Sequence, residues 1–200
     1  MMSKTHLAVG MAAAMAVASV NGFADCALAL AGGALGGVIA DADILDNDYK
    51  KDALIGELIA VGIVAIVSVL DFFLNWGMCS YIATNKFLPI AGGVGFMVLW
   101  IISFFTSHRT FTHSLLSMIL FSACIFAIYP KVGLIFLTAY FSHIFIDMFN
   151  KKDVQILFPL KRGFCFKLIY ANSAANTVIM WIGFGITLLL IILKLFVLKK

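Results

Sequence analysis

Charged residues are scarce in this chain. Asp, Glu, Lys and Arg make up only 12% of its 200 residues, whereas 63% of the residues are hydrophobic. The mean hydropathy is +1.07. A soluble domain carries about 25% charged residues, so this chain has too few to cover a water-facing surface. The shortage excludes an ordinary soluble protein and indicates an integral membrane protein that is surrounded by membrane lipids.

Paired cysteines are missing as well. The four cysteines stand far apart, at Cys26, Cys79, Cys124 and Cys165, and no two form a CxxC pair. Their spacing favours neither a disulfide framework nor a cysteine-rich zinc site. The sequence also lacks a serine-hydrolase elbow, a P-loop and a dinucleotide fingerprint. Because its basic residues lie between apolar runs, they favour orientation in a membrane, and no nucleic-acid partner is expected.

Apolar runs fill most of the chain, and several reach about 18 residues, the length that crosses about 30 Å of hydrocarbon. Four glycines between positions 32 and 37 predict close helix contacts. We expect a single all-α domain over residues 1–200, a polytopic transmembrane helical bundle of about six to seven membrane segments. The seven segments are Leu7–Val20, Ala24–Ala40, Ala53–Trp76, Phe87–Thr106, Thr112–Tyr129, Val132–Phe149 and Ala174–Leu198.

The first segment is short and is expected to be a half-span or a tightly packed helix. With Lys4 before it and small residues near Ala24 after it, it would also fit a cleaved signal peptide. A discarded peptide would have no use for the Thr5-His6 motif that precedes this segment. We therefore expect the segment to remain part of the protein.

Alternating segments, with the first two as a hairpin, place most basic residues on one side of the membrane. Nine of the fourteen fall on this side, which the positive-inside rule predicts to be the cytoplasm. The nine are Lys4, Lys50, Lys51, Arg109, Lys151, Lys152, Lys161, Arg162 and Lys167.

All four histidines lie in short polar motifs at segment ends on that same side. The motifs are Thr5-His6, Asp41-Ala-Asp43, the run from His108 to Ser114, and His143 with Asp147. His143 and Asp147 are four residues apart, which places them on one helix face. A carboxylate inside a membrane is costly unless it is paired, hydrated or bound to a cation. An internal His–Asp hydrogen bond that only packs the bundle is the alternative.

The other motifs allow both functional and structural interpretations. His108 and His113 flank a turn, with Thr110 or Thr112 as the expected helix N-cap. Arg109 suits a phosphate or carboxylate, or simply follows the positive-inside rule. Asp41 and Asp43 lie near the membrane boundary and are candidate ligands, whereas Asp46, Asp48 and Asp52 are expected to form a solvated acidic loop. His6 is either a ligand or an ordinary interfacial histidine, and Thr5 is a candidate N-cap.

Imidazole and carboxylate together suit Zn²⁺ first, with Mn²⁺ or Fe²⁺ as alternatives. The number of candidate ligands exceeds what one tetrahedral ion needs, so the sequence predicts one or two ions. A two-metal hydrolytic centre lowers the pKa of water and stabilises charge on a phosphoryl or carbonyl oxygen. The candidate ligands are His6, Asp41, Asp43, His108, His113, His143 and Asp147.

In these motifs the sequence resembles the YdjM-type family of inner-membrane, predicted metal-dependent hydrolases. Thr5-His6, the Gly-rich run into Asp41-Ala-Asp43, the run from His108 to Ser114, and His143 with Asp147 match the family pattern in the correct order. Ala40 stands where the family usually has proline. The resemblance spans most of the chain and implies a multi-pass protein of the bacterial inner membrane with metal-dependent hydrolase activity.

The leading hypothesis is a hydrolase that acts on a lipid or lipid-linked phosphoester at the cytoplasmic interface. Arg109 would hold a substrate phosphate, and Asp43 would act either as a ligand or as the base. Two alternatives stay open. One is an ion or proton transporter, and the other is a non-catalytic membrane protein with a structural metal site. The sequence leaves the oligomeric state open.

Overall fold

The computed structural model describes residues 1–44 and 47–197, and its regular elements are helices. Within these residues there is no β-strand, only isolated bridges that pair Asn150 with Ile169 and Val154 with Phe164. The expected all-α class is therefore confirmed. The α-helices are α1 (Ser3–Val17), α2 (Phe23–Val38), α3 (Asn47–Leu74), α4 (Met78–Thr84), α5 (Phe87–Ser103), α6 (Leu115–Ile128), α7 (Pro130–Asp147) and α8 (Ala174–Ile192). A 3-10 helix, η1 (Ile39–Asp43), follows α2, and a π-helix, η2 (Leu193–Val197), follows α8.

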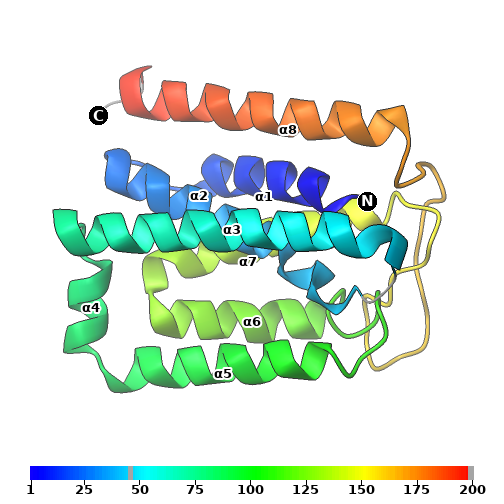
Figure 1. Ribbon diagram of the computed structural model, residues 1–200, viewed down its shortest axis with the longest axis horizontal. Helices are drawn as coiled ribbons and strands as arrows, with labels where there is room; N and C mark the ends of the chain where they lie inside the picture. Colours follow the sequence, from blue (N-terminus) through cyan, green and yellow to red (C-terminus); the bar gives the residue numbers. More distant parts are fainter. Residues whose placement is uncertain (45–46, 198–200) are drawn as a thin grey trace.

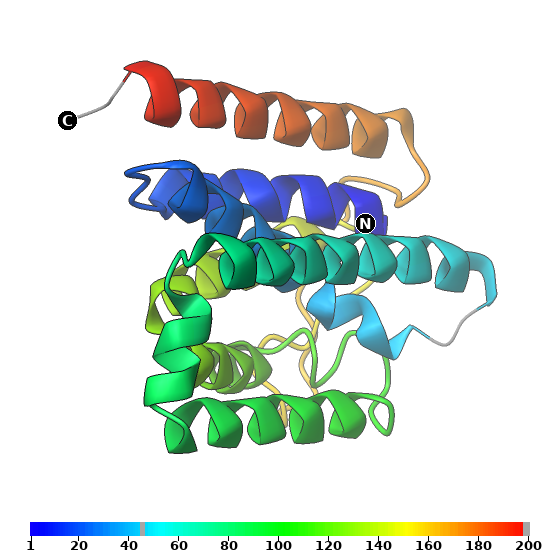
Figure 2. The same ribbon diagram turned by 60° about the vertical axis from the view of Figure 1, so that its left-hand side comes forward.

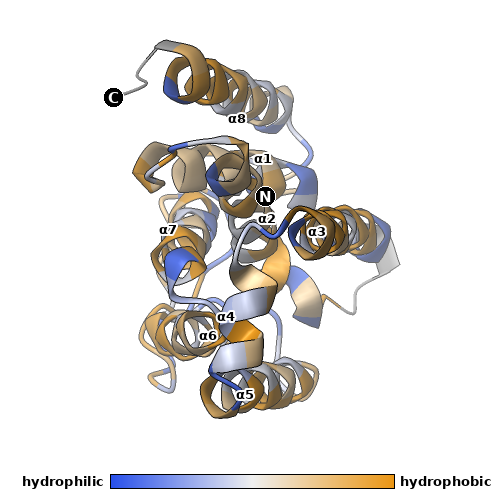
Figure 3. Ribbon diagram, turned by 90° about the vertical axis from the view of Figure 1, so that its left-hand side faces the viewer, coloured by the Kyte–Doolittle hydropathy of each residue, from blue (hydrophilic) through white to orange (hydrophobic). Residues whose placement is uncertain are grey.

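Most helices run along one common axis, and the short α4 crosses it at one end (Figure 1). Seen end-on, the α1–α2 hairpin lies between α8, α3 and α7 (Figure 3). The α5–α6 hairpin packs against α7 through α6. Figure 2 shows η1 between α3 and the α5–α6 hairpin. The central position of α1 explains why most of its residues are buried although they are small or polar.

Fewer helices are long and apolar enough to cross a membrane than the six to seven expected. Within residues 1–44 and 47–197, three qualify by length and composition, Phe23–Asp43, Tyr49–Leu74 and Ala174–Phe196, or four if the bent pair α4–α5 counts as one span. The expected number was wrong because apolar character does not guarantee length. The 15 residues of α1 and the 14 of α6 reach only about 21–23 Å at 1.5 Å per residue. The longer α7 carries Lys131, His143 and Asp147 among its apolar residues.

The outward faces of the long helices are apolar. Leu58 and Phe72 of α3 are 61% and 66% exposed, and Trp181 and Leu188 of α8 are 66% and 60% exposed. Large apolar side chains on the outside, with small and polar ones inside, fit a hydrocarbon environment. Figure 3 shows this apolar colouring on the outer helices.

Glycines bring α1 and α2 into close contact, as the glycine-rich run predicts. A Cβ on Gly37 would stand 2.6 Å from the His6 carbonyl oxygen, and one on Gly33 would stand 2.6 Å from the Ala14 side chain. Gly10 of α1 meets the same two glycines. This close approach holds His6 against the end of α2, where the chain continues into η1.

Replacing Gly37 by alanine is expected to destabilise the protein by about 1–3 kcal/mol, because the added methyl group overpacks the α1–α2 contact. Thermal unfolding in detergent measures the effect. Gly185→Ala is the matched control, since a Cβ there meets no atom within 4 Å. Equal melting temperatures for the two variants would contradict this account of the α1–α2 contact.

Candidate metal centre

Four separate segments bring polar side chains to one end of the bundle, the end that carries the N-terminus in Figure 1. His6 comes from the first turns of α1, and Asp41 and Asp43 come from η1. His143 and Asp147 occupy the last turns of α7. The loop between α5 and α6 supplies the remaining candidates, His108, Arg109 and His113. The seven residues predicted as ligands thus lie in one cluster, linked by the contacts described below.

Three of these side chains form a small triangle of ligand atoms. Nε2 of His113 lies 3.2 Å from Nε2 of His143 and 3.9 Å from Oδ1 of Asp41. The third edge, from His143 Nε2 to Asp41 Oδ1, is 3.6 Å. Tetrahedral ligands about 2.0–2.1 Å from a zinc ion stand about 3.3–3.4 Å apart. The triangle therefore has nearly the size that one small divalent cation requires.

Asp147 stands between the other groups. One of its oxygens lies 3.2 Å from His6 Nε2 and also contacts the Met1 amino group. The other lies 3.4 Å from His113 Nε2 and 3.1 Å from the Arg109 guanidinium. Its side chain is only 1% exposed. A carboxylate whose two oxygens face different imidazoles is suited to share its charge between two cation positions.

Hydrogen bonds at Nδ1 orient three of the histidines. His143 Nδ1 lies 2.7 Å from the Gly37 carbonyl oxygen, and His108 Nδ1 lies 2.7 Å from Asp43 Oδ1. His113 Nδ1 lies 3.0 Å from the Thr112 hydroxyl, which donates to the other Asp43 oxygen at 2.6 Å. Such outer partners fix ring orientation in metal sites and leave Nε2 free.

Two buried polar atoms of the cluster, Nδ1 of His6 and Oδ2 of Asp41, lack any partner among the described residues. Nε2 of His6 and Oδ2 of Asp147 have only the ion-pair contacts given above. The His6 ring instead stacks on His143, with ring centroids 3.6 Å apart. Buried polar groups are normally satisfied, so these atoms have the property expected of ligands that need a cation. The residues present fit one or two divalent ions with nitrogen and oxygen ligands.

Two sets of three residues also offer ligand atoms that all lie within 4.8 Å of one another. One set is His6 with His143 and Asp147, and the other is Asp41 with His108 and His113. Burial lowers the pKa of His113 to about 4. This imidazole is consequently neutral near pH 7, which is the form that binds metals. Asp43 belongs to neither group, and its two oxygens contact His108 and Thr112.

Arg109 occupies a strained position beside the cluster. Its φ is +67°, in the left-handed region that residues with a Cβ seldom adopt. The guanidinium contacts Asp147 and donates to the Lys152 carbonyl oxygen at 2.9 Å, and Nε is buried without a partner among the described residues. A phosphate-binding role therefore stays a prediction, with one donor of the side chain still unused.

Some local predictions were wrong. The N-cap of α6 is Ser114, whose side chain accepts from the Ser117 amide, and not Thr110 or Thr112. Thr5 lies inside α1 and is not its cap. Asp52 is not solvated, because it is 9% exposed in α3 and accepts a hydrogen bond from the Ser3 amide at 2.6 Å. Asp46 lies outside the described residues.

Sequence reasoning missed the groups that support the cluster. Thr112 links His113 to Asp43, and the Tyr140 hydroxyl donates to the Thr112 carbonyl oxygen at 2.6 Å. Tyr140 precedes His143 by three residues, so a search for polar residues on the His143 face of α7 would have found it. The Gly37 carbonyl leaves no signal in a side-chain pattern.

Comparison with known proteins supports the resemblance seen in the motifs. The family model described as YdjM inner membrane protein matches residues 1–199. The chain belongs to this family. Membership of the YdjM family agrees with the apolar outward faces of α3 and α8. No curated protein and no solved structure matches this chain.

Thr112→Val is expected to lower metal affinity about 10-fold, because it removes the hydroxyl that orients His113 and Asp43. Zinc titration with a competing chelator measures the change. Thr110→Val is the matched control in the same loop, since the Thr110 hydroxyl bonds only the Ser107 carbonyl oxygen. Similar affinities for both variants would show that this hydroxyl does not support a metal site.

Proposed function

We propose that this protein is a metal-dependent hydrolase of the inner membrane that acts on a lipid or lipid-linked phosphoester. The observation that carries the proposal is the set of buried nitrogen and oxygen atoms on His6, Asp41 and Asp147, of which His6 Nδ1 and Asp41 Oδ2 have no hydrogen-bond partner among the described residues. They stand beside His113 and His143 at ligand-like distances and at the end of an apolar bundle. A site at that depth is reached most readily by a substrate whose reacting group is a lipid headgroup.

The proposed roles follow from the contacts. His6, Asp41, His108, His113, His143 and Asp147 would hold one or two divalent ions, with Zn²⁺ first and Mn²⁺ or Fe²⁺ as alternatives. A bound ion would supply Lewis acidity and lower the pKa of water.

Two further residues would act on the reaction beside the ligands. Arg109 would orient the substrate phosphate. Asp43 would serve as the proton acceptor through its contact with His108, instead of acting as a direct ligand.

A cytoplasmic position of the site is part of the proposal. The site end carries Lys50 and Lys51 at the start of α3 and Lys151 and Lys152 after α7, whereas the opposite helix ends carry Lys86, Lys131 and Lys194 (Figure 1). The excess of basic residues at the site end supports the cytoplasmic side.

The transporter alternative has less support. A transport path needs polar groups at both ends of the bundle. Of the described residues, Asp71 is the one buried charged side chain away from the site end. It accepts hydrogen bonds from the Met78 and Cys79 amides at 2.9 and 2.6 Å, which anchors the start of α4. Asp71 thus has a structural task already. A non-catalytic metal staple is the remaining alternative, and substrate turnover decides it.

Metal analysis of the detergent-purified protein tests the proposal. The wild type is expected to contain about one or two Zn²⁺ per chain, and His143→Ala and Asp41→Ala are expected to lose most of it, because each removes a ligand. Asp25→Ala is the control, since Asp25 lies at the opposite end of α2. Unchanged trace metal in all four proteins would refute the metal site. Full metal content without release of any headgroup from membrane lipids would refute the hydrolase and favour the staple.

A further inference from the structure

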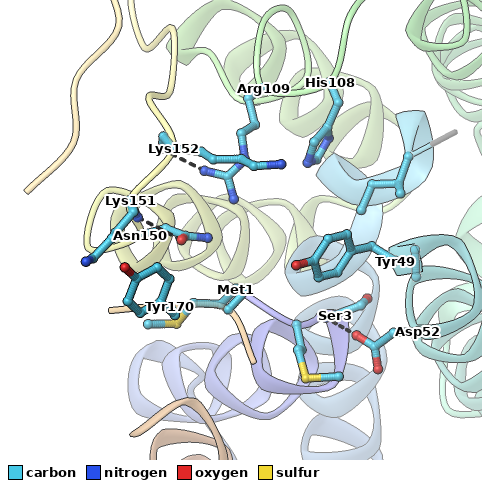
Figure 4. Close-up of a pocket in the computed structure, with 14 residues that line it drawn as sticks. Met1, Ser3, Tyr49, Asp52, His108, Arg109, Asn150, Lys151, Lys152 and Tyr170 are labelled. Carbon is cyan, nitrogen blue, oxygen red and sulfur yellow. Dashed lines mark hydrogen bonds between the residues drawn. The ribbon is translucent and has the colours of Figure 1, made fainter. Parts of the chain in front are cut away.

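A pocket of roughly 200 Å³ adjoins the metal cluster on its outer side. Figure 4 shows His108 and Arg109 side by side at its upper wall, with both side chains directed into the pocket. These two residues also contact Asp43 and Asp147 of the cluster. The pocket therefore adjoins the candidate metal centre at these two side chains, whereas the other predicted ligands do not line it.

One wall of the pocket is cationic. It is formed by Arg109 together with Lys151 and Lys152, which begin the connection between α7 and α8. Arg109 is 9% exposed, and its Nε has no partner among the described residues. Arg guanidinium groups pair strongly with phosphate oxygens, and this one contributes its charge to the pocket wall while its other nitrogens contact Asp147 and the Lys152 carbonyl oxygen. Lys151 lies 3.8 Å from the Tyr170 ring centre and Lys152 lies 5.9 Å from that of Tyr49, so each ammonium group stands beside an aromatic face.

The facing wall is apolar for the most part but carries one carboxylate. Its apolar residues are Met1, Met2, Ile44 and Ala53, and its polar ones are Ser3, Tyr49 and Asp52, whose carboxylate accepts a hydrogen bond from the Ser3 amide. A site for a free inorganic anion does not need such a wall. A cationic wall opposite an apolar one fits a molecule whose phosphate adjoins a hydrocarbon part.

The surface beside the pocket continues this apolar character. Immediately after Ala53, α3 exposes Leu54 and Ile55 by 51% and 43%, and one turn further it exposes Leu58. These residues belong to the lipid-facing part of α3. An acyl chain attached to a headgroup in the pocket can therefore lie along α3 within the membrane.

We propose that this pocket binds the headgroup of an anionic phospholipid with a small headgroup, such as a phosphate monoester on diacylglycerol. Arg109 and Lys152 contact the phosphate, and the methionine-lined wall contacts the glycerol part. Pockets for drug-sized ligands span about 300–1,000 Å³, so this smaller one accommodates a small headgroup in full and a nucleotide-linked or oligosaccharide-linked headgroup only in part. The proposal names the substrate class of the hydrolase and rests on that function for the reaction, although not for binding.

Binding of short-chain lipids to metal-stripped protein tests this assignment. The full chain is placed in phosphatidylcholine nanodiscs, treated with EDTA and titrated with dihexanoyl phosphatidic acid by calorimetry. Saturable binding is expected. Inorganic phosphate and the cytidine diphosphate ester of dihexanoylglycerol are each expected to bind at least about 10-fold more weakly, because the first lacks the apolar part and the second exceeds the pocket.

Variants at the cationic wall complete the test. Lys152→Gln is expected to weaken phosphatidic acid binding about 10-fold, the worth of one charge-assisted contact. Lys152→Arg is expected to keep it. Lys161→Gln is the matched control, because Lys161 is exposed in the same connection and does not line this pocket. Unchanged melting temperatures show that the variants are folded.

Three results would overturn the assignment: no saturable binding, equal affinity for inorganic phosphate, or equal losses in Lys152→Gln and Lys161→Gln. Tight binding of the nucleotide-linked lipid would also overturn it, by refuting the size limit. Because metal has been removed, lipid binding by a protein that never contains metal would leave this proposal standing and refute only the hydrolase. Metal content without lipid binding would refute this proposal and leave the metal site of the proposed hydrolase standing.

Discussion

A carboxylate that leaves water loses solvation worth several kcal/mol, which must be replaced by cations or hydrogen bonds. Asp147 meets this constraint at the end of α7, where its side chain is almost fully buried. Arg109 and the Met1 amino group contact it, and His6 and His113 stand within 3.4 Å. Two segments of the chain, the N-terminal end with α1 and the α5–α6 loop, thus converge on one carboxylate of α7. The arrangement of the site end depends on keeping this charge compensated.

Three backbone features make that convergence possible: close glycine contacts, a short 3-10 helix and one left-handed residue. Glycines at the α1–α2 contact let His6 approach the end of α2, where Gly37 also offers its carbonyl oxygen to His143. The short η1 then buries both aspartates against the site. A left-handed residue, Arg109, directs the α5–α6 loop so that its guanidinium and the two histidines face the same centre. The site is therefore built from helix ends and one loop that pack against each other.

The sequence predicted the polar residues that are costly to bury in a membrane, and it predicted less well the features that depend on helix length and tertiary contacts. Histidines and carboxylates inside apolar segments are expensive, so His6, His143 and Asp147 could be named from the pattern, and their ligand atoms lie together in the fold. Membrane spans were overcounted because α1 and α6 are apolar yet too short.

The remaining misses have a common origin in tertiary contacts. The sequence pattern predicts a solvated Asp52, but its side chain is buried and accepts a hydrogen bond from the Ser3 amide. Thr112 and Tyr140 act through contacts that join three segments, which no local period encodes.

The central claim is that the buried His–Asp cluster is a metal centre, and X-ray absorption at the zinc edge of the purified, zinc-loaded protein tests it most directly. The account predicts a first shell of nitrogen and oxygen at about 2.0–2.1 Å with the outer scattering of two or more imidazoles, and no sulfur. A shell with sulfur at about 2.3 Å, or one without imidazole scattering, would contradict it, because the zinc would then be held elsewhere on the chain.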